Sequence, residues 1–424
     1  MGFANHYLNN YRIYPDYIET TPDKNLNLIV FIPCYNEPNL TKTLDALYNC
    51  KRPKSPVEII IVINSSVDED KQIIENNLKS LQQAEQWIKE HNEKSFTFYT
   101  IYQPNLQKKY AGVGFARKIG MDEAVSRFNK INNNKGILVA FDADATCDDN
   151  FLTEIENHFA KNKKTTACSI YYEHPISGTQ FSESIYKTIT QYELYLRYYN
   201  LSLRYANFPF AYHTVGSSFA VKADVYAKQG GMNRKKAGED FYFLQKVIPL
   251  GNFTELHTTR VIPSPRPSDR VPFGTGATIK KFEENNISDL YTYNFQAFID
   301  LKSFISLIDK LYKIEDSKLV DFYKEIPKNI KEFLIANNFD LAINDINNNC
   351  SNLTNFRKRF FVWFNAFKVL KYLNFTHEHN LEKVKITEVA SQLLKKIKPD
   401  TDIPTDEKQL LLIFRSIEKK RRVG

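Results

Sequence analysis

Residues 137–144 read ILVAFDAD, so that five apolar residues run directly into two aspartates flanking an alanine. A short, continuous apolar run of this kind is typical of a strand that is buried on both faces of a sheet. Three further strands are predicted before it along the chain: a continuous apolar run at 28–32, a β-branched strand at 57–63 and a third strand at 96–102. Buried strands that alternate with helical patterns predict a mainly parallel sheet flanked by helices, an α/β fold.

The helices between these strands are predicted at 40–47, 67–91 and 114–128. After about Phe282 the strand signals fade and helical spacing of apolar residues takes over. This later part is predicted to hold helices at 297–312, 318–337, 356–373 and 386–397. We therefore expect an N-terminal extension at 1–25, an α/β domain at 26–280, and a helical C-terminal domain or extension at 281–424.

The composition is that of a folded globular chain, with 42% hydrophobic and 25% charged residues among 424. The net charge of +8 is spread evenly along the chain, so we expect no nucleic-acid partner. The exception is the basic C-terminal tail, residues 419–424. It is either a solvated tail or a weak peripheral contact with anionic lipid.

No apolar run approaches the roughly 18–20 residues that a membrane-spanning helix needs. The N-terminal stretch also lacks the basic start and apolar run of a signal peptide. We therefore expect a cytoplasmic protein, with peripheral contact at the inner face of the membrane left open. Five scattered cysteines without a CxxC pair argue against a disulfide framework and against structural zinc, and we expect them to be small core residues.

Polar and acidic residues follow the predicted strands, and ligands of open α/β sheets bind at the carboxyl ends of strands. The most informative group is Asp142-Ala143-Asp144, directly after the fourth strand. Two carboxylates at this spacing can both reach one hard cation such as Mg²⁺ or Mn²⁺, which readily shares its oxygen ligands with a diphosphate. The alternative is that the pair caps the helix that follows.

A second acidic pair, Glu239-Asp240, follows Gly238 and precedes an aromatic helical stretch. These carboxylates either cap that helix or accept a proton from a hydroxyl nucleophile. A metal-bound diphosphate together with a general base suits group transfer from an activated donor.

These motifs, in this order along the chain, resemble those of family 2 glycosyltransferases of the GT-A fold. The residues that carry the resemblance are 32–37 (IPCYNE), 112–118 (GVGFARK), 142–144 (DAD) and 238–240 (GED), and the match covers about residues 26–275. It implies an inverting, metal-dependent enzyme that moves a sugar from a UDP- or GDP-sugar to a saccharide or lipid-linked saccharide acceptor. Polysaccharide or cell-envelope glycan synthesis is the setting that the family suggests.

The resemblance also implies roles for individual residues at the donor site. The nucleotide pocket would be lined by Pro33, Tyr35 and Glu37. Arg117 would lie near the nucleotide or its phosphates.

The acidic motifs take the remaining implied roles. Asp142 would contact the ribose or the metal, and Asp144 would bind the Mg²⁺ or Mn²⁺ ion. Asp240 would be the general base, with Glu239 beside it, capping the helix or binding acceptor hydroxyls. His257 is the candidate for a third metal ligand, and an ordinary, partly buried histidine is the alternative.

The chain departs from the family pattern at two places that bear on the donor. Asn64 stands where many members have an aspartate that meets the nucleotide base, which leaves the identity of the base open. The Gln-x-x-Arg-Trp motif of processive members is absent, and a Pro- and Gly-rich loop with Arg266 and Arg270 stands in its place. These arginines either clamp a diphosphate bidentately or anchor the loop by ion pairing.

The residues also bear on three alternative functions. A dinucleotide-binding dehydrogenase would need a third glycine where the chain has Arg117. A sugar nucleotidyltransferase would need a Gly-rich, basic loop after the first strand, where the chain has Pro33 to Glu37. A catalytically silent scaffold that binds sugar or nucleotide remains the alternative, and the retained Asp142, Asp144 and Asp240 argue against it.

Overall fold

The computed structural model describes residues 2–400 and 402–421, and they form two compact units. The first unit combines the chain up to Tyr186 with His213–Asn285 and a short piece that begins at Lys419. The second unit combines Lys187–Tyr212 with Asn286–Glu418. The units differ from the predicted division in one main respect. Residues 187–212 lie within the predicted α/β domain but pack with the later helices.

An eight-stranded sheet forms the centre of the first unit, in the order β3-β2-β1-β4-β7-β6-β8-β5. Strands β3, β2, β1 and β4 run parallel, so their carboxyl ends meet at one edge of the sheet. The sheet then turns mixed, because β7 pairs antiparallel with both β4 and β6, and β5 pairs antiparallel with β8. The strands are β1 Leu28–Cys34, β2 Val57–Ser66, β3 Phe96–Leu106, β4 Ile137–Ala140, β5 Thr146–Cys147, β6 Ala167–Tyr172, β7 Phe219–Lys222 and β8 Phe253–Ile262.

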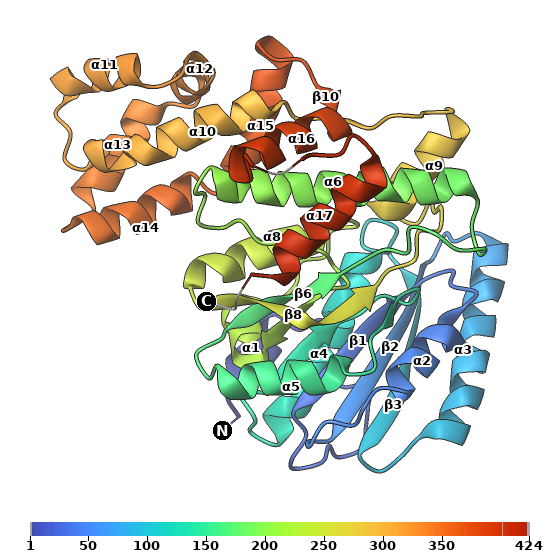
Figure 1. Ribbon diagram of the computed structural model, residues 1–424. Coiled ribbons are helices and arrows are strands. Elements are labelled where there is room, and N and C mark those ends of the chain that lie inside the picture. The colour runs from blue at the N-terminus through green and yellow to red at the C-terminus, as the bar shows by residue number, and fades with distance from the viewer. Residues whose placement is uncertain (1, 401, 422–424) are drawn as a thin grey trace. The chain divides into compact units, whose positions relative to one another are not determined.

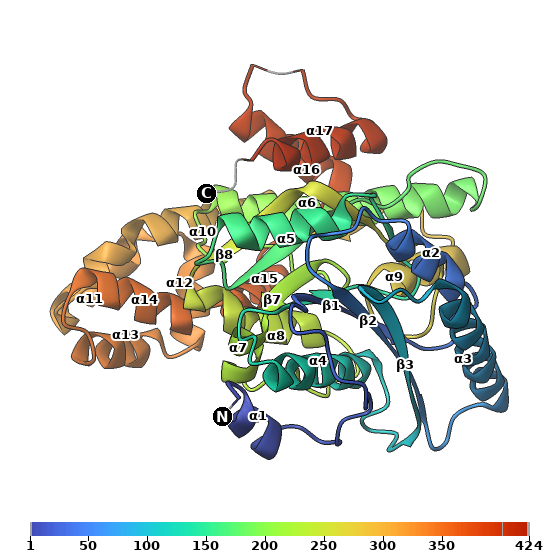
Figure 2. The same ribbon diagram turned by 90° about the horizontal axis from the view of Figure 1, so that it is seen from below.

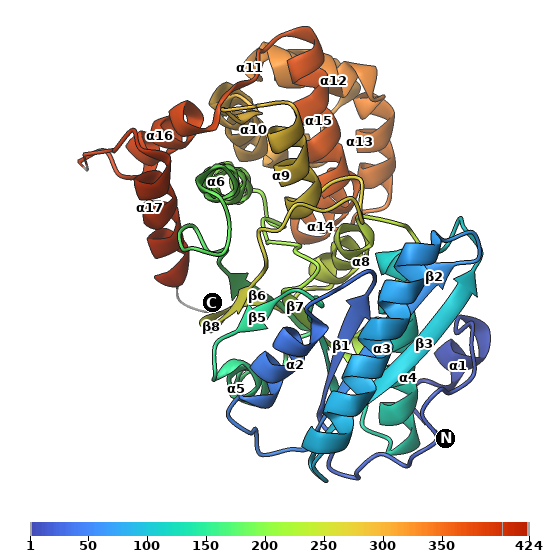
Figure 3. The same cartoon turned by 90° about the vertical axis from the view of Figure 1, so that its right-hand side faces the viewer.

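Helices cover both faces of this sheet. Figure 3 shows α2 and α3 on one face of the parallel strands and α4 on the other. Every residue of β1 and β2 is buried, as expected of strands that are covered on both faces of the sheet. This arrangement confirms the predicted GT-A-type α/β class. The helices of this unit are α1 Asn5–Asn10, α2 Leu40–Tyr48, α3 Lys71–His91, α4 Val113–Lys130, α5 Phe151–Lys161, α7 Ala223–Lys228, α8 Glu239–Val247 and α9 Thr275–Glu284.

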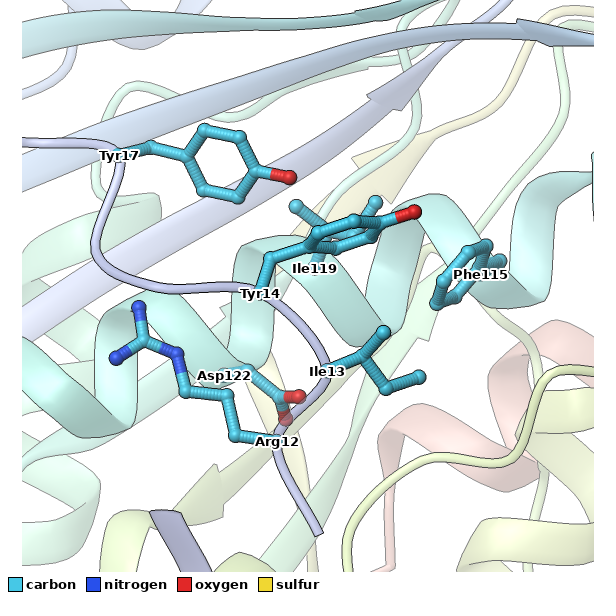
Figure 4. A pocket seen from close by; sticks show the side chains of 7 residues that line it. All are labelled: Arg12, Ile13, Tyr14, Tyr17, Phe115, Ile119 and Asp122. Atoms are coloured by element: carbon cyan, nitrogen blue, oxygen red, sulfur yellow. The ribbon is translucent and has the colours of Figure 1, made fainter. Parts of the chain in front are cut away.

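The N-terminal residues pack against α4 rather than extending away from the sheet (Figure 2). The Tyr7 hydroxyl donates to Asp122 at 2.6 Å, and Arg12 pairs with Glu123 at 3.0 Å. A small pocket of about 10 Å³ remains between this segment and α4, where the Tyr14 ring lies over Ile119 with Phe115 to its side (Figure 4). It has room for about one water molecule, which excludes it as a sugar or nucleotide site.

The second unit is helical, as predicted for the C-terminal part of the chain. Figure 1 shows α10 to α15 gathered in one bundle, with α17 alongside α6. A two-stranded ladder of β9 (Tyr291–Thr292) and β10 (Val384–Lys385) adds to it. Its helices are α6 Glu183–Tyr205, which begins in the first unit, α10 Phe295–Leu307, α11 Asp316–Glu325, α12 Lys328–Ala336, α13 Phe339–Asn348, α14 Leu353–Trp363, α15 Ala366–His379, α16 Ile386–Ile397 and α17 Glu407–Lys419.

Two of the predicted C-terminal helices are each broken into two. The predicted helix at 318–337 ends at Glu325 and restarts at Lys328, because Pro327 cannot donate a helical hydrogen bond. The predicted helix at 356–373 is interrupted between Trp363 and Ala366, where Asn365 caps the second segment. None of the helices in the described part of the chain has both the length and the hydropathy to cross a membrane. The basic tail ends at 422–424, outside the described residues.

Candidate active site

The structure brings the two acidic motifs together through Arg117, a residue of α4. Its guanidinium donates to Asp142 at 2.6 Å and also forms an ion pair with Glu239 at the start of α8. Asp142 follows β4, about 100 residues away from Glu239 in the sequence. The fold therefore joins the turn after β4 to the N-terminus of α8 through one buried arginine.

Two glycines allow the elements around Arg117 to approach this closely. A side chain at Gly216 would lie 2.5 Å from the Arg117 guanidinium. A Cβ atom at Gly114 would lie 2.1 Å from the Lys235 carbonyl and 3.0 Å from the Glu239 side chain. A larger residue at either position would push apart the segments that hold the acidic residues.

The two carboxylates at the start of α8 have different environments. Glu239 is almost fully buried and paired with Arg117, whereas Asp240 is only partly buried and its carboxylate accepts from the backbone N–H of Phe241. Burial and the neighbouring charge of Glu239 raise the pKa of Asp240 to about 7, against the opposing effect of Arg117. Asp240 can therefore exchange a proton near neutral pH.

The Pro- and Gly-rich loop places its two arginines on a second set of carboxylates. Arg270 bridges Asp144 at 2.7 Å and Glu37 at 3.0 Å. Arg266 pairs with Glu37 at 2.6 Å and lies 4.0 Å from Asp144. The loop is thus anchored by ion pairs, one of the two roles predicted for these arginines. The Glu37 side chain is fully buried, while Arg266, Arg270 and Asp144 keep about a quarter of their side-chain surface exposed.

The charged side chains in this cluster shift the pKa values of Asp144 and Arg270. Burial raises the pKa of Asp144, with Asp142 and Glu37 adding to the rise and Arg270 opposing it. Burial disfavours the charge on Arg270, but the surrounding carboxylates outweigh it and raise its pKa. The acidic groups therefore hold Arg270 firmly charged in this cluster.

The other residues predicted for the nucleotide pocket lie along the same edge of the sheet. Pro33 is buried near the end of β1, and Tyr35 is half-buried just beyond it. Burial and Glu69 raise the pKa of the Tyr35 hydroxyl. The Asn64 side chain donates to the Gly112 carbonyl at 3.3 Å, so it holds the segment that leads into α4.

His257 lies apart from this cluster. It is on β8, with its ring 6.0 Å from that of Tyr171, and it lowers the pKa of His158 after the larger effect of burial. β8 is irregular at this point, since its pairing with β6 shifts register between Leu256 and Val261, the residues on either side of this stretch. In the described ranges, no group of three or more His, Cys, Asp or Glu residues is arranged to hold a metal ion.

Sequence reasoning missed two features of this site. It assigned Glu37 to the nucleotide pocket but did not identify it as the ion-pair partner of both Arg266 and Arg270. It also did not pair Arg117 with Glu239, because nothing in the sequence links α4 to the start of α8. The sequence carried only a weak indication that Gly114 and Gly216 make close contacts, namely that glycine is rare in this chain, with 14 residues.

Three solved structures of one protein resemble the fold at low sequence identity. S. aureus TarS 1–349 in complex with UDP-GlcNAc is 12% identical, with a TM-score of 0.41, over 80% of this chain and 92% of that one. TarS 1–349 alone is 13% identical, with a TM-score of 0.39 and the same coverage. The complex of TarS 1–349 with UDP is 14% identical, with a TM-score of 0.36, over 93% and 88% of the two chains. At these scores the likeness adds nothing to the argument.

A search of curated proteins finds no match to this chain. The family comparison does find one: residues 29–221 match the family model described as glycosyl transferase family 2. This range contains the loop after β1, Arg117 and the two aspartates after β4. The chain therefore carries a domain of glycosyl transferase family 2 and is a glycosyltransferase.

Proposed function

We propose that the chain transfers a sugar from a nucleotide-diphosphate sugar to an acceptor hydroxyl with inversion at the anomeric carbon. The observation that carries the proposal is the bridge from Asp142 through Arg117 to Glu239, with Asp240 next to it. It brings a donor-side carboxylate and a proton acceptor together in one cluster of side chains. Direct displacement needs both, because the base must act on the face opposite the leaving diphosphate.

Asp240 is the proposed general base. Its carboxylate takes the proton from the acceptor hydroxyl as the new glycosidic bond forms. A pKa of about 7 suits this role, because a base with a pKa near the working pH combines ionisation with proton affinity. Glu239 is held by Arg117 and buried, so in this proposal it positions the arginine and leaves the proton transfer to Asp240.

Arg266 and Arg270 are the proposed diphosphate-binding groups. A guanidinium binds phosphate oxygens bidentately, as it binds carboxylates. Both side chains remain partly exposed in their ion pairs with Glu37 and Asp144, so a donor can reach them. On donor binding, we expect Arg270 to move from Asp144 to the diphosphate and thereby free the Asp144 carboxylate.

Mg²⁺ or Mn²⁺ is the proposed cofactor, held by Asp142 and Asp144. Such ions often take only one or two protein carboxylates and complete their shell with phosphate oxygens and water. Two hard carboxylates fit that donor set. The proposal leaves out His257, whose ring lies 6.0 Å from that of Tyr171. When bound, the ion neutralises charge on the leaving diphosphate.

The substrate classes follow from the family rather than from the geometry. We propose a UDP- or GDP-sugar as donor and a saccharide or lipid-linked saccharide as acceptor, in polysaccharide or cell-envelope glycan synthesis. Asn64 binds the Gly112 carbonyl, so contact with the base would have to come from its remaining side-chain oxygen or from neighbouring residues. This leaves the choice between uridine and guanosine to experiment.

The test compares Asp240→Asn with Glu239→Gln in a transfer assay over a panel of nucleotide sugars, with Mn²⁺ and with EDTA. Asp240→Asn keeps the shape but removes the base, so we expect transfer to fall at least ~100-fold while donor affinity changes little. EDTA should abolish transfer by the wild-type protein.

Three results would contradict the proposal. If Asp240→Asn transfers sugar at the wild-type rate and Glu239→Gln does not, then Glu239 is the general base instead of Asp240. Equal transfer with EDTA would remove the metal from the mechanism. No turnover of any nucleotide sugar, by a wild-type protein that binds them, would favour a silent scaffold.

A further inference from the structure

Two cysteines that are far apart in the sequence lie in contact in the first unit. Cys50 follows α2 and Cys147 is the second residue of β5, and their Sγ atoms are 3.6 Å apart. A disulfide joins its sulfurs at about 2.05 Å, so side-chain rotation and a small backbone shift would bring these two within bonding distance. Cys50 is buried at 3% exposure, while Cys147 is partly open to solvent.

Backbone and side-chain hydrogen bonds hold the two segments together on both sides of the thiols. The Lys51 N–H donates to the Asp149 carbonyl at 2.7 Å. On the other side, the Thr43 hydroxyl of α2 donates to the Ala143 and Ala145 carbonyls at 2.8 and 3.0 Å. The sulfurs are therefore positioned by the fold, and closing a bond between them orders little additional chain.

We propose that Cys50 and Cys147 form a redox-modification site, which a peroxide converts to an intramolecular disulfide. One sulfur attacks the peroxide O–O bond and becomes a sulfenic acid as water leaves. The second sulfur then attacks the first, the S–O bond breaks and a second water leaves. Overall, two thiols and one hydrogen peroxide give one disulfide and two waters, with two electrons passing from sulfur to oxygen. A dithiol reductant reverses the change.

The surroundings of the sulfurs distinguish this pair from two of the other cysteines. The sulfur–sulfur hydrogen bond lowers the pKa of Cys50 and raises that of Cys147, so Cys50 is the first of the two to ionise. Burial raises the pKa of Cys34, and it raises that of Cys168 to about 12. Thiolates react and thiols do not, so oxidation should select the pair over these two buried residues.

The disulfide would fasten the turn that carries the acidic pair. That turn runs from β4 to β5, and it already contacts α2 through Thr43. β5 also pairs with β8 through Cys147 and Val261, just before the loop that bears Arg266 and Arg270. A covalent bond from Cys50 to Cys147 would therefore link α2 to β5, which adjoins both the turn with the acidic pair and the loop with Arg266 and Arg270.

The experiment treats the full-length protein, carrying Cys350→Ser to remove a partly exposed thiol, with hydrogen peroxide. Of the four remaining thiols, two should be lost to maleimide labelling, with a mass decrease of about 2 Da. A linked peptide containing Cys50 and Cys147 should appear and should disappear on reduction. The melting temperature of the oxidised form should rise by roughly 5 °C, because the bond closes a long loop.

Two variants complete the test. Cys50→Ser in the same background should keep all its thiols under the same treatment, and the matched control Cys168→Ser should still lose two. If Cys50→Ser does not fold, the peptide map of the Cys350→Ser protein is sufficient to test the proposal, because both Cys50 and Cys147 are unchanged in it.

The proposal is overturned if all four thiols survive a peroxide concentration that oxidises Cys350 in the wild-type protein. It is also overturned if the linked peptides join other cysteines, or if the oxidised form melts no higher than the reduced one. None of these readouts depends on glycosyl transfer, so they stand apart from the proposed function.

Discussion

Each unit contains a cluster of arginines and carboxylates among its described residues, and these two clusters differ in their exposure to solvent. In the second unit, α6 and α17 are joined by Glu193, Arg197, Arg415 and Glu418. Arg415 donates to both oxygens of Glu193 at 2.7 and 2.8 Å. None of these four side chains is more than 9% exposed.

The cluster in the first unit has the same chemistry but is unbalanced and partly open. Three arginines meet five carboxylates there, which leaves an excess of two negative charges if all are ionised. Asp142 keeps 34% of its side-chain surface exposed, and Asp144 and Arg270 keep 23%. A cluster shielded from solvent holds two helices together, whereas an open one with excess negative charge can exchange its partners for a cation, a proton or a diphosphate.

The largest expected effect comes from breaking the closed cluster. Glu193→Ala would leave Arg197 and Arg415 without their shared carboxylate in a dry site, so the free energy of unfolding should fall by about 3–5 kcal/mol. Urea denaturation followed by circular dichroism measures it. The matched control is Asp309→Ala, which removes an exposed partner of Arg357 in the same unit and should cost less than ~1 kcal/mol. Equal losses in the two variants would mean that burial does not distinguish these ion pairs.

Arg270→Ala tests whether the open cluster exchanges partners. Calorimetric affinity for UDP or GDP should weaken about tenfold, because a charge-assisted contact to the diphosphate is lost. Stability should change by less than ~1 kcal/mol, since the side chain is partly exposed. Lys280→Ala, which removes an exposed cation near the same loop, should leave the affinity unchanged. Tighter nucleotide binding by Arg270→Ala would mean that the arginine blocks the site instead of binding the donor.

A smaller effect is expected from pH, through Asp240. With a pKa of about 7 instead of the ordinary 3.8, the base is mostly protonated below neutral pH. The transfer rate under kcat/KM conditions should therefore rise about fourfold from about pH 6.5 to about pH 8 and then level off.

Stability should respond in the opposite direction. Because the pKa of Asp240 is raised in the folded protein, the stabilisation it provides is complete below about pH 4 and is lost as the pH rises through about 7. Asp240→Asn should remove this part of the pH dependence of unfolding. A transfer rate that stays flat between about pH 6 and pH 8 would show that Asp240 titrates normally or is not the base.

The sequence alone determined the strands, the α/β class and the position of the acidic motifs. The continuous apolar runs at 28–32 and 137–141 and the β-branched run at 57–63 are typical of strands in a covered sheet, so they were recognisable without knowledge of their neighbours. The predicted strand at 96–102 belongs to β3, which lies at the edge of the sheet and is only partly buried. Residues that follow such strands must lie at the edge where the carboxyl ends meet. That rule selected Asp142 and Asp144 as candidates from local pattern alone.

Tertiary structure alone decided which of these groups are paired and which remain open. Arg117 selects Glu239 over Asp240, Arg270 lies on Asp144, and Cys50 meets Cys147 across 97 positions of sequence. Periodicity reports which face of an element is buried, but not which side chain of a distant element lies opposite. That depends on strand order and register, and the strength of each charge interaction depends on the burial that packing creates.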